Sequence, residues 1–326
     1  LTQVKILEKF GARVSWEIPP KPAEPQMRHP RSLFVPGKEL MSALHRQLKK
    51  LHNILLLEDC LALRLLTEGG EVTGALLFNI REGSVIVCES KATILATGSL
   101  GEIFAGSAHE PMGIPTGSTG SGYVLAGWAG ADLVDMEMIQ FAAIPVSPPL
   151  VRGMRCLPWA PLLNKEGREF YPPDIGEYSH EGAQAAYREL KEGRGPLYMD
   201  LRDKKPAIHA RHPLVAQRSN RLREFEATPY QQVIGVGIGA LYMMGGVHIN
   251  ERCETSVPGL YAAGEVSGNV HGARRVAGNA FPEIIVFGAR AGKHAALYAG
   301  KKKALPEAPQ AQIRKVLARL ENTLME

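Results

Sequence analysis

The sequence predicts an α/β protein in which one domain is divided into two parts by an inserted domain. Three observations support this: a run of strands ending in a buried strand at 93–96, a second buried strand at 260–264 before a long helix, and an irregular proline-rich stretch between them. Apolar strands of this kind are typical of a parallel sheet that is covered by helices. We place the divisions near residues 138 and 236, so that the first and third parts form one split domain.

The N-terminal region begins with helix and loop signals. Residues 4–11 are expected to end a helix, because Gly11 is a common type of C-cap. The segment 19–36 is rich in proline and basic residues and is expected to be loop. An amphipathic helix is then expected from Gly37 to Asn53, with leucines at helical spacing on one face: Leu40, Leu44, Leu48 and Leu51.

A three-stranded antiparallel meander is predicted next. Its strand-like runs lie at 54–66, 72–79 and 85–89. Gly69-Gly70 and Glu82-Gly83 separate these runs in the manner of hairpin turns. The meander leads into Thr93–Ala96, whose small apolar residues predict a buried parallel strand.

The remaining elements follow from helix and strand patterns. We expect loop up to Gly120, a helix at 122–129 closed by Gly130, irregular chain from Pro145 to Pro173, a helix at 180–191, strands and turns from Gly235, and a long helix at 281–299.

The composition is that of a globular protein without a membrane span. Of the 326 residues, 45% are hydrophobic and 22% are charged. No apolar run approaches the ~18 residues that a spanning helix needs, so direct membrane insertion is not expected. The net charge is +5, but the one dense basic cluster, Lys301–Lys303, has no interleaved aromatic residues. Nucleic-acid binding is therefore not expected either.

The four cysteines are Cys60, Cys88, Cys156 and Cys253, and none forms a C-x-x-C pair. An iron–sulfur or zinc site within this chain is therefore not expected. Widely spaced cysteines fit free thiols in a reducing compartment, which predicts a cytoplasmic location. The chain opens without an initiator Met or a signal peptide, and we expect it to be the interior of a longer product.

Two glycine-containing turns are candidate binding sites. At 94–98, a buried strand runs into Ala96-Thr97-Gly98, where a nucleotide can approach the backbone, although an ordinary strand end would look the same. At 116–122, a turn containing Thr119, Gly120, Ser121 and Gly122 precedes a helix. The free N–H groups of a helix N-terminus accept anionic or carbonyl ligand atoms, but a flexible loop is an equally good interpretation.

The third motif is long and ordered. A strand at 257–263 ends in Gly264-Glu265, His271-Gly272-Ala273-Arg274-Arg275 follows, and Gly278-Asn279-Ala280-Phe281 opens a long helix. A carboxylate just after a strand can accept hydrogen bonds from sugar hydroxyls. The helix N-terminus adds partial positive charge and free N–H groups. The three motifs together predict a nucleotide-like cofactor.

These motifs resemble the flavin-binding end of the succinate dehydrogenase/fumarate reductase flavoproteins. The resemblance covers Lys91 to about Gly300 and includes, in the family's order, Leu95–Gly98, Thr119–Gly122, Asp135–Phe141, Leu163–Phe170, Met244–Gly246, Gly259–Glu265, His271–Arg275, Gly278-Asn279 and Val286–Gly292. It implies an incomplete FAD-binding domain of the glutathione-reductase type with an inserted α+β capping domain. The implied segments are FAD-binding at 1–138, capping at 139–235, FAD-binding at 236–300 and the start of a helical region at 301–326.

The resemblance also implies which residues bind. The FAD-binding residues would be Ala96, Thr97, Gly98, Thr119, Gly120, Ser121, Gly122, Gly264, Glu265, Asn279, Ala280 and Phe281. Arg275 matches an arginine that binds a substrate carboxylate, and Arg155 lies near the position of a catalytic arginine but out of register. The implied partners are a small-molecule substrate and an iron–sulfur electron-transfer subunit.

The chain departs from the family in two respects. The N-terminal phosphate-binding G-x-G-x-x-G is absent, so the chain alone is expected to bind FAD poorly or not at all. Gly235–Ala240 matches a G-x-G-x-x-A pattern, but Gly245-Gly246 come within a few residues, so no long helix can follow it to hold a pyrophosphate. The family's two substrate-site histidines are replaced by Ala142 and Leu241. Their loss removes donors for a carboxylate and makes the pocket apolar.

Three functions remain open at this point. The first is an FAD-dependent oxidoreductase that transfers hydride at a carbon–carbon bond of a substrate other than fumarate or succinate. The second is a non-catalytic or electron-transferring flavoprotein subunit, which the loss of both histidines suggests. The third is a degenerate domain without flavin, against which Gly264-Glu265 and Asn279 argue.

Overall fold

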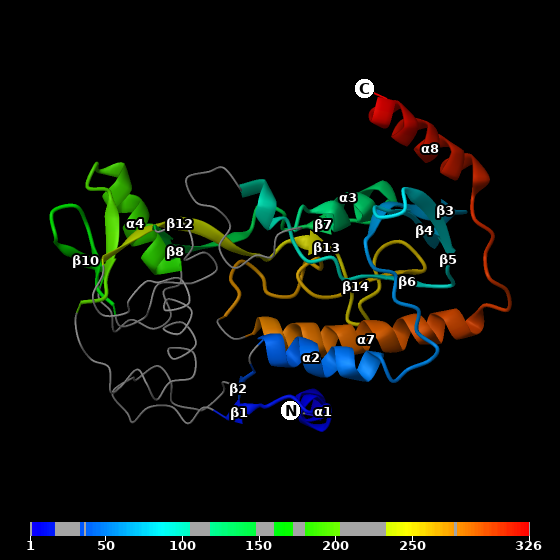
Figure 1. Ribbon diagram of the computed structural model, residues 1–326, viewed down its shortest axis with the longest axis horizontal. Helices are drawn as coiled ribbons and strands as arrows, with labels where there is room; N and C mark the ends of the chain where they lie inside the picture. The colour runs from blue at the N-terminus through cyan, green and yellow to red at the C-terminus, as the bar shows by residue number, and fades with distance from the viewer. Residues whose placement is uncertain are drawn as a thin grey trace.

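The computed structural model describes residues 2–16, 33–35, 37–104, 118–147, 160–171, 180–202, 233–276 and 279–325 (Figure 1). Its helices are α1 (Thr2–Lys9), α2 (Gly37–Leu48), the 3-10 helix η1 (Gly101–Phe104), α3 (Ser121–Trp128), α4 (His180–Lys191), α7 (Ala280–Lys301) and α8 (Gln310–Met325). Its strands are β1 (Ser15–Trp16), β2 (Leu33–Phe34), β3 (Cys60–Glu68), β4 (Glu71–Asn79), β5 (Ser84–Glu89), β6 (Thr93–Leu95), β7 (Leu133–Val134), β8 (Ile139–Ser147), β9 (Leu162–Leu163), β10 (Glu169–Tyr171), β11 (Leu197–Asp200), β12 (Val233–Met243), β13 (Gly246–Val247) and β14 (Leu260–Ala262).

One body of the structure is built around the parallel pair β14-β6. The antiparallel meander β3-β4-β5 and the pair β13-β7 lie beside it, and α7 contacts both parallel strands (Figure 1). The largest hydrophobic core belongs to this body, and it gathers side chains from the meander, α3, β14 and α7, such as Leu65, Leu125, Tyr261 and Ala291. A smaller apolar cluster holds α1, α2 and Ile285 of α7 together.

The second body is a five-stranded antiparallel sheet in the order β10-β9-β11-β12-β8, with α4 packed on one face (Figure 1). Its core joins Ala186 of α4 to strand residues such as Ala143, Leu162 and Met199. The long strands β8 and β12 pair along most of their length, and they connect this sheet to the first body at Ile139↔Met243 and Gln140↔Tyr242. The predicted division at residues 235–236 falls inside β12, and the domain limits remain a prediction.

Several predicted elements are confirmed by the backbone. The meander, the parallel strand after it, and the helices α3, α4 and α7 lie where the sequence placed them. Gly69 and Gly70 both have positive φ in the β3–β4 turn, as a tight hairpin requires. Gly235–Ala240 is part of strand β12, so it is not a phosphate-binding loop.

Other predictions were wrong. Residues 54–57 form no strand, and α2 ends at Leu48, short of Asn53. The predicted loops contain short elements: β2 lies within 19–36 and η1 follows β6. The stretch predicted to be irregular contains β9, β10 and the end of β8, where Pro145 pairs with Val236. Because β8 is an edge strand, a residue without an N–H is tolerated there.

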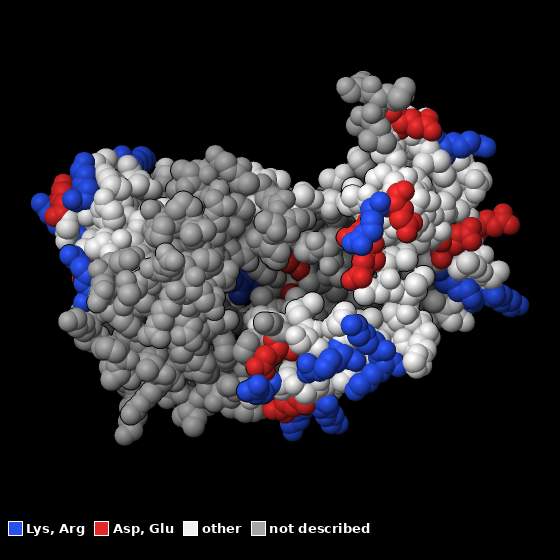
Figure 2. Space-filling model, viewed as in Figure 1, with Lys and Arg blue, Asp and Glu red and all other residues white. Residues whose placement is uncertain are grey.

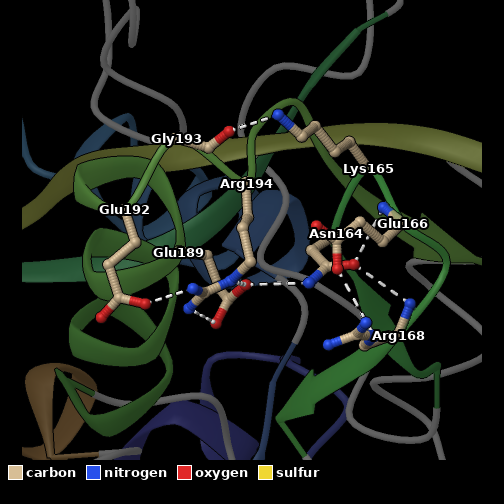
Figure 3. Close-up of polar contacts among 8 residues, drawn as sticks. All are labelled: Asn164, Lys165, Glu166, Arg168, Glu189, Glu192, Gly193 and Arg194. Carbon is tan, nitrogen blue, oxygen red and sulfur yellow. Dashed lines mark hydrogen bonds and ion pairs between the residues drawn. The ribbon is translucent and has the colours of Figure 1, made fainter.

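The family-like Leu163-Asn164 motif has a clear structural role. Asn164 is buried, and its Oδ1 accepts hydrogen bonds from the backbone N–H groups of Glu166 (3.0 Å) and Arg168 (3.1 Å), which fixes the β9–β10 turn. Its Nδ2 donates to Glu189 Oε2 of α4 at 3.0 Å. Arg194 donates two further bonds to the same carboxylate, both at 2.7 Å, and pairs with Glu192 (Figure 3). This network ties the hairpin to the end of α4.

The Glu189→Gln variant should be less stable than the wild type by about 1.5–3 kcal/mol, because the ionised acceptor of several charge-assisted bonds is lost. The bonds from Arg194 and Asn164 lower the pKa of Glu189 to about 2. A depressed carboxyl pKa gives stability that is complete above the ordinary pKa near 4.5 and is lost as the pH falls toward 2. Urea unfolding at pH 7 and pH 4 measures both effects, and the variant should lose less stability on acidification.

Glu166→Gln is the matched control. Glu166 pairs with Arg168 at 3.4 Å, but the side chains are 39% and 78% exposed. Such surface pairs contribute about 0–1 kcal/mol, so this variant should resemble the wild type. Equal losses in the two variants would contradict the role given to Glu189.

Candidate functional site

The site forms where the two parallel strands end. Leu260 pairs with Thr93 and Ala262 with Leu95, so both strands point their carboxyl ends to the same edge. The N–H of Ala263 donates to the carbonyl of Leu95 at 3.0 Å and extends the pairing by one step. The turns Ala96-Thr97-Gly98 and Gly264-Glu265 therefore leave the sheet side by side, although they are far apart in sequence.

The 119–122 turn packs against both of these segments. A Cβ added to Gly122 would lie 1.9 Å from Thr97 Oγ1 and 3.0 Å from a methyl group of Val266, so only glycine permits this contact. The N–H of Gly120 donates to the carbonyl of Ser99 at 3.0 Å. Tyr123 directly follows the turn, and its hydroxyl donates to the carbonyl of Glu265 at 2.9 Å. Thr119 is exposed and Ser121 is half-buried, so both line the turn rather than the core.

The N-terminus of α7 is the fourth component. Its N-cap residue, Asn279, makes no side-chain capping bond, so it leaves first-turn N–H groups of this long helix available. Ala280 is half-buried and Phe281 is 44% exposed. The preceding Gly278 lies outside the described residues. An uncapped helix N-terminus carries partial positive charge, so it favours an anion or a carbonyl oxygen.

Two carboxyl groups lie close to this edge. Glu265 Oε1 accepts a hydrogen bond from the N–H of Met243 at 2.9 Å. Burial raises the pKa of Glu265, and the Met243 N–H, the Ser99 hydroxyl and the Arg275 charge oppose this rise. Glu283 in the first turn of α7 is 5% exposed. Burial is also the main cause that raises the pKa of Glu283, to about 7, and the negative charge of Glu265 adds to it.

Arg275 supplies the positive charge. It is 5% exposed, and its guanidinium carbon lies 4.5 Å from the ring centroid of Tyr242, a cation–π contact. Gln140 Nε2 donates to the backbone carbonyl of Arg275 at 3.4 Å. The Tyr242 hydroxyl donates to Glu283 Oε2 at 3.4 Å and lies 3.3 Å from His271 Nε2. Burial, and then the Arg275 charge, lower the pKa of His271.

The structure brings most of the predicted residues together. Arg275 lies beside Glu265 and Glu283, and the three turns meet at one edge, whereas Arg155 falls outside the described residues. Near the centre of one face the molecule is hollowed, and charged atoms show in the hollow (Figure 2).

The two positions at which the family has histidine lie in one apolar cluster. Ala142 and Ile144 are fully buried there, and Leu241 and Val146 pack against them. Gln140, Ala142 and Ile144 alternate along β8, so they share one face of the strand, about 7 Å apart per step. Ala142, where the apolar cluster begins on β8, therefore lies two residues from Gln140, which donates to the Arg275 backbone carbonyl.

The comparisons with known proteins identify the family. A family profile described as an FAD binding domain matches residues 9–281, which is most of the chain. The chain belongs to this family of FAD-dependent oxidoreductases. FAD is therefore the cofactor of the family to which the chain belongs, and the resemblance to the succinate dehydrogenase/fumarate reductase flavoproteins is confirmed.

Related proteins agree with this assignment. An uncharacterised FAD-dependent oxidoreductase of Methanocaldococcus jannaschii is 34% identical over 285 residues, covering 79% of this chain and 49% of that protein. The fumarate reductase flavoprotein subunit of Mycobacterium tuberculosis is 31% identical over 303 residues, covering 85% and 51%. A variant of FrdA from E. coli quinol fumarate reductase superposes with a TM-score of 0.80 at 25% identity, covering 98% and 60%. The chain thus spans about half the length of the curated relatives it matches.

Three residues of the candidate site were not among the predicted site residues. Tyr242, Glu283 and Gln140 reach it through contacts between strands and helices that are distant in sequence. No sequence signal marked Glu283, because an acidic residue in the first turn of a helix is common and its burial shows only in the structure. One signal was available for Gln140, which lies within the family-like block 135–141. Among the described residues, no helix is long and apolar enough to cross a membrane, and no group of His, Cys, Asp and Glu could hold a metal ion.

Gly122→Ala should destabilise the protein by about 1–3 kcal/mol, because the new methyl group would overlap Thr97 and force the turn apart. Gly127→Ala in the same helix is the control. The nearest atom to its new Cβ is Leu133 Cδ1 at 3.9 Å, so the change should be neutral or stabilise by up to about 1 kcal/mol. Urea unfolding of both variants measures their free energies of unfolding. Equal losses of stability would exclude the close packing of the 119–122 turn against Thr97.

Glu283→Gln should change how stability depends on pH. A carboxyl pKa raised by folding gives stability that is complete below the ordinary value of 4.5 and is lost as the pH rises through about 7. The wild type should therefore lose up to about 1.4 kcal/mol per pH unit in this window, and the variant should lose less. Unfolding of flavin-free protein between pH 5 and pH 8 measures the slope. An unchanged slope would mean that Glu283 ionises normally.

Proposed function

We propose that the full protein is an FAD-dependent oxidoreductase that transfers hydride at a carbon–carbon bond, with the five-stranded sheet as its capping domain. The observation that carries the proposal is the meeting of three glycine-containing turns and an uncapped helix N-terminus at the carboxyl edge of a parallel pair. Ligands of α/β proteins bind at such an edge. Bound flavin would supply the two-electron chemistry that no protein side chain provides.

The described residues fit the flavin part of FAD. We assign Ala96, Thr97, Gly98, Thr119, Gly120, Ser121 and Gly122 to the backbone surface against which it would lie. Gly264 and Glu265 would lie against the ribityl chain, where Glu265 would accept hydrogen bonds from hydroxyls in addition to the one from Met243. Asn279, Ala280 and Phe281 would direct helix N–H groups to a carbonyl edge. The described residues include no loop suited to the pyrophosphate, so binding of the whole cofactor is assigned to the longer protein.

The substrate we infer carries one carboxylate or carbonyl group beside an apolar part. Arg275 is buried and close to the edge, so it can hold the polar group. The apolar cluster of Ala142, Ile144, Leu241 and Val146 takes the place of two histidine donors. Among the residues that the structure describes, this cluster offers no partner to a second carboxylate, as in fumarate, whose desolvation there would be costly. Closure of the capping domain would exclude water from the reaction.

Reoxidation of the reduced full-length protein tests this function. An enoate with an apolar substituent, such as cinnamate, should reoxidise the flavin with a kcat/KM at least about tenfold above that of fumarate. Arg275→Gln should lower the rate about 100-fold, because a buried charged donor is lost. Arg274→Gln should lower it by no more than about threefold, because the Arg274–Glu181 pair is half-exposed. Rapid turnover of fumarate would contradict the proposal.

The second candidate is an electron-transferring subunit that passes electrons to an iron–sulfur partner. The replacement of both family histidines by Ala142 and Leu241 favours it. In that case the reduced flavin would be reoxidised by one-electron acceptors, but by no enoate. Either function suits the cytoplasm, where the free thiols of Cys60, Cys88 and Cys253 would remain reduced.

A further inference from the structure

We propose that Tyr242 is a positioning residue for Arg275, and that through this contact the five-stranded sheet determines where the substrate-binding guanidinium lies. The inference rests on the proposed function, in which Arg275 holds the polar group of the substrate. It adds a residue that would touch neither flavin nor substrate.

The contact between the two side chains is close and buried. The guanidinium carbon of Arg275 lies 4.5 Å from the centroid of the Tyr242 ring, and the two residues are 5% and 8% exposed. Attraction between a cation and an aromatic face is strongest where water is excluded. The ring of Tyr242 therefore forms a platform for the charge of Arg275.

The platform itself is held in a fixed orientation. The Tyr242 hydroxyl donates to Glu283 Oε2 at 3.4 Å and lies 3.3 Å from His271 Nε2. The His271 ring meets the Tyr242 ring edge to face, with centroids 5.5 Å apart. Burial, followed by the charges of Glu283 and Glu265, raises the pKa of Tyr242 far above its usual range, and Arg275 only partly opposes this. The hydroxyl thus stays neutral and remains a hydrogen-bond donor.

Two further contacts join the same turn to the sheet. Arg274 pairs with Glu181 of α4, with 3.3 Å between Nη1 and Oε1. Gln140 of β8, which is directly opposite Tyr242 in the sheet, donates to the Arg275 carbonyl. Consecutive arginines therefore contact α4, β8 and β12, all of which belong to the five-stranded sheet and its helix.

This arrangement has a functional consequence. Arg275 belongs by sequence to the FAD-binding body, but its side chain and carbonyl contact Tyr242 and Gln140, on the strands that join this body to the sheet. A displacement of the sheet would remove the aromatic platform and change the position of the guanidinium. Arg275 would then be correctly placed for substrate only when the sheet lies in the position seen here.

Chemical labelling of arginine measures this placement directly. Full-length, flavin-loaded protein is treated with phenylglyoxal, and peptide mass spectrometry follows labelling at Arg275 and at the exposed neighbour Arg274. Tyr242→Met removes the aromatic face but keeps much of the volume, and it should speed labelling of Arg275 about tenfold while Arg274 is unchanged. Unchanged labelling of Arg275 in this variant would overturn the proposal.

Tyr242→Phe provides the second comparison, since it keeps the ring and loses only the hydroxyl. Labelling of Arg275 should stay within about threefold of the wild type, because the ring face remains. Labelling as fast in this variant as in Tyr242→Met, with no change at Arg64, would show that the ring does not hold Arg275. Arg64 lies over Trp128 at 4.7 Å, away from the site, so it reports any general loosening of the structure.

Malonate distinguishes this inference from the proposed function. If Arg275 holds a carboxylate, malonate should slow its labelling in the wild type. If malonate has no effect, the proposed substrate site fails, but the ratio of labelling rates between Tyr242→Met and Tyr242→Phe still decides whether Tyr242 positions Arg275.

Discussion

The parallel pairing of β6 with β14 is the constraint on which the rest of the site depends. Each strand has only three residues, and the two are separated by more than half of the chain. The pairing is nevertheless well supported, because Leu260, Tyr261 and Ala262 are buried in the largest core. It places the turns at Ala96 and Gly264 at one edge, and Gly122 then fits against both segments. Without the pairing, none of these residues would share a site.

The charges at this edge form a small, poorly solvated set. Glu265 and Glu283 share the neighbourhood of Arg275, and Glu283 has a pKa of about 7. A buried carboxylate that lacks its own counter-ion is expensive, so protonation of Glu283 keeps the set close to neutral. Glu283 also accepts a hydrogen bond from the Tyr242 hydroxyl, and the Tyr242 ring lies against Arg275, which couples the electrostatics of the edge to the position of the sheet.

The sequence predicted the parts of the fold that depend on local signals. The α4 helix has clear amphipathic spacing. The glycines at 69–70 readily adopt the positive φ that a tight turn requires, so both elements were placed correctly. The β9 and β10 strands were missed because they have two and three residues, too few for a periodic pattern. Pro145 also argued against a strand, and only its place at the sheet edge allows it. The turns of the candidate site were predicted from motifs. Gln140 lies in the family-like block 135–141, but its contact with Arg275, like that of Tyr242, joins segments that are distant in sequence.

Flavin binding at this edge is proposed to depend on Glu265, and the flavin content of the full-length protein measures that dependence. We would purify the wild type, Glu265→Leu and the control Glu254→Gln, whose carboxylate accepts a bond from Asn250 in a surface turn. The visible flavin absorbance per protein should be normal in the wild type and the control, and at least about tenfold lower in Glu265→Leu at limiting FAD, because the ribityl acceptor is lost. Equal flavin content in all three proteins, with unchanged affinity for FAD, would contradict the account.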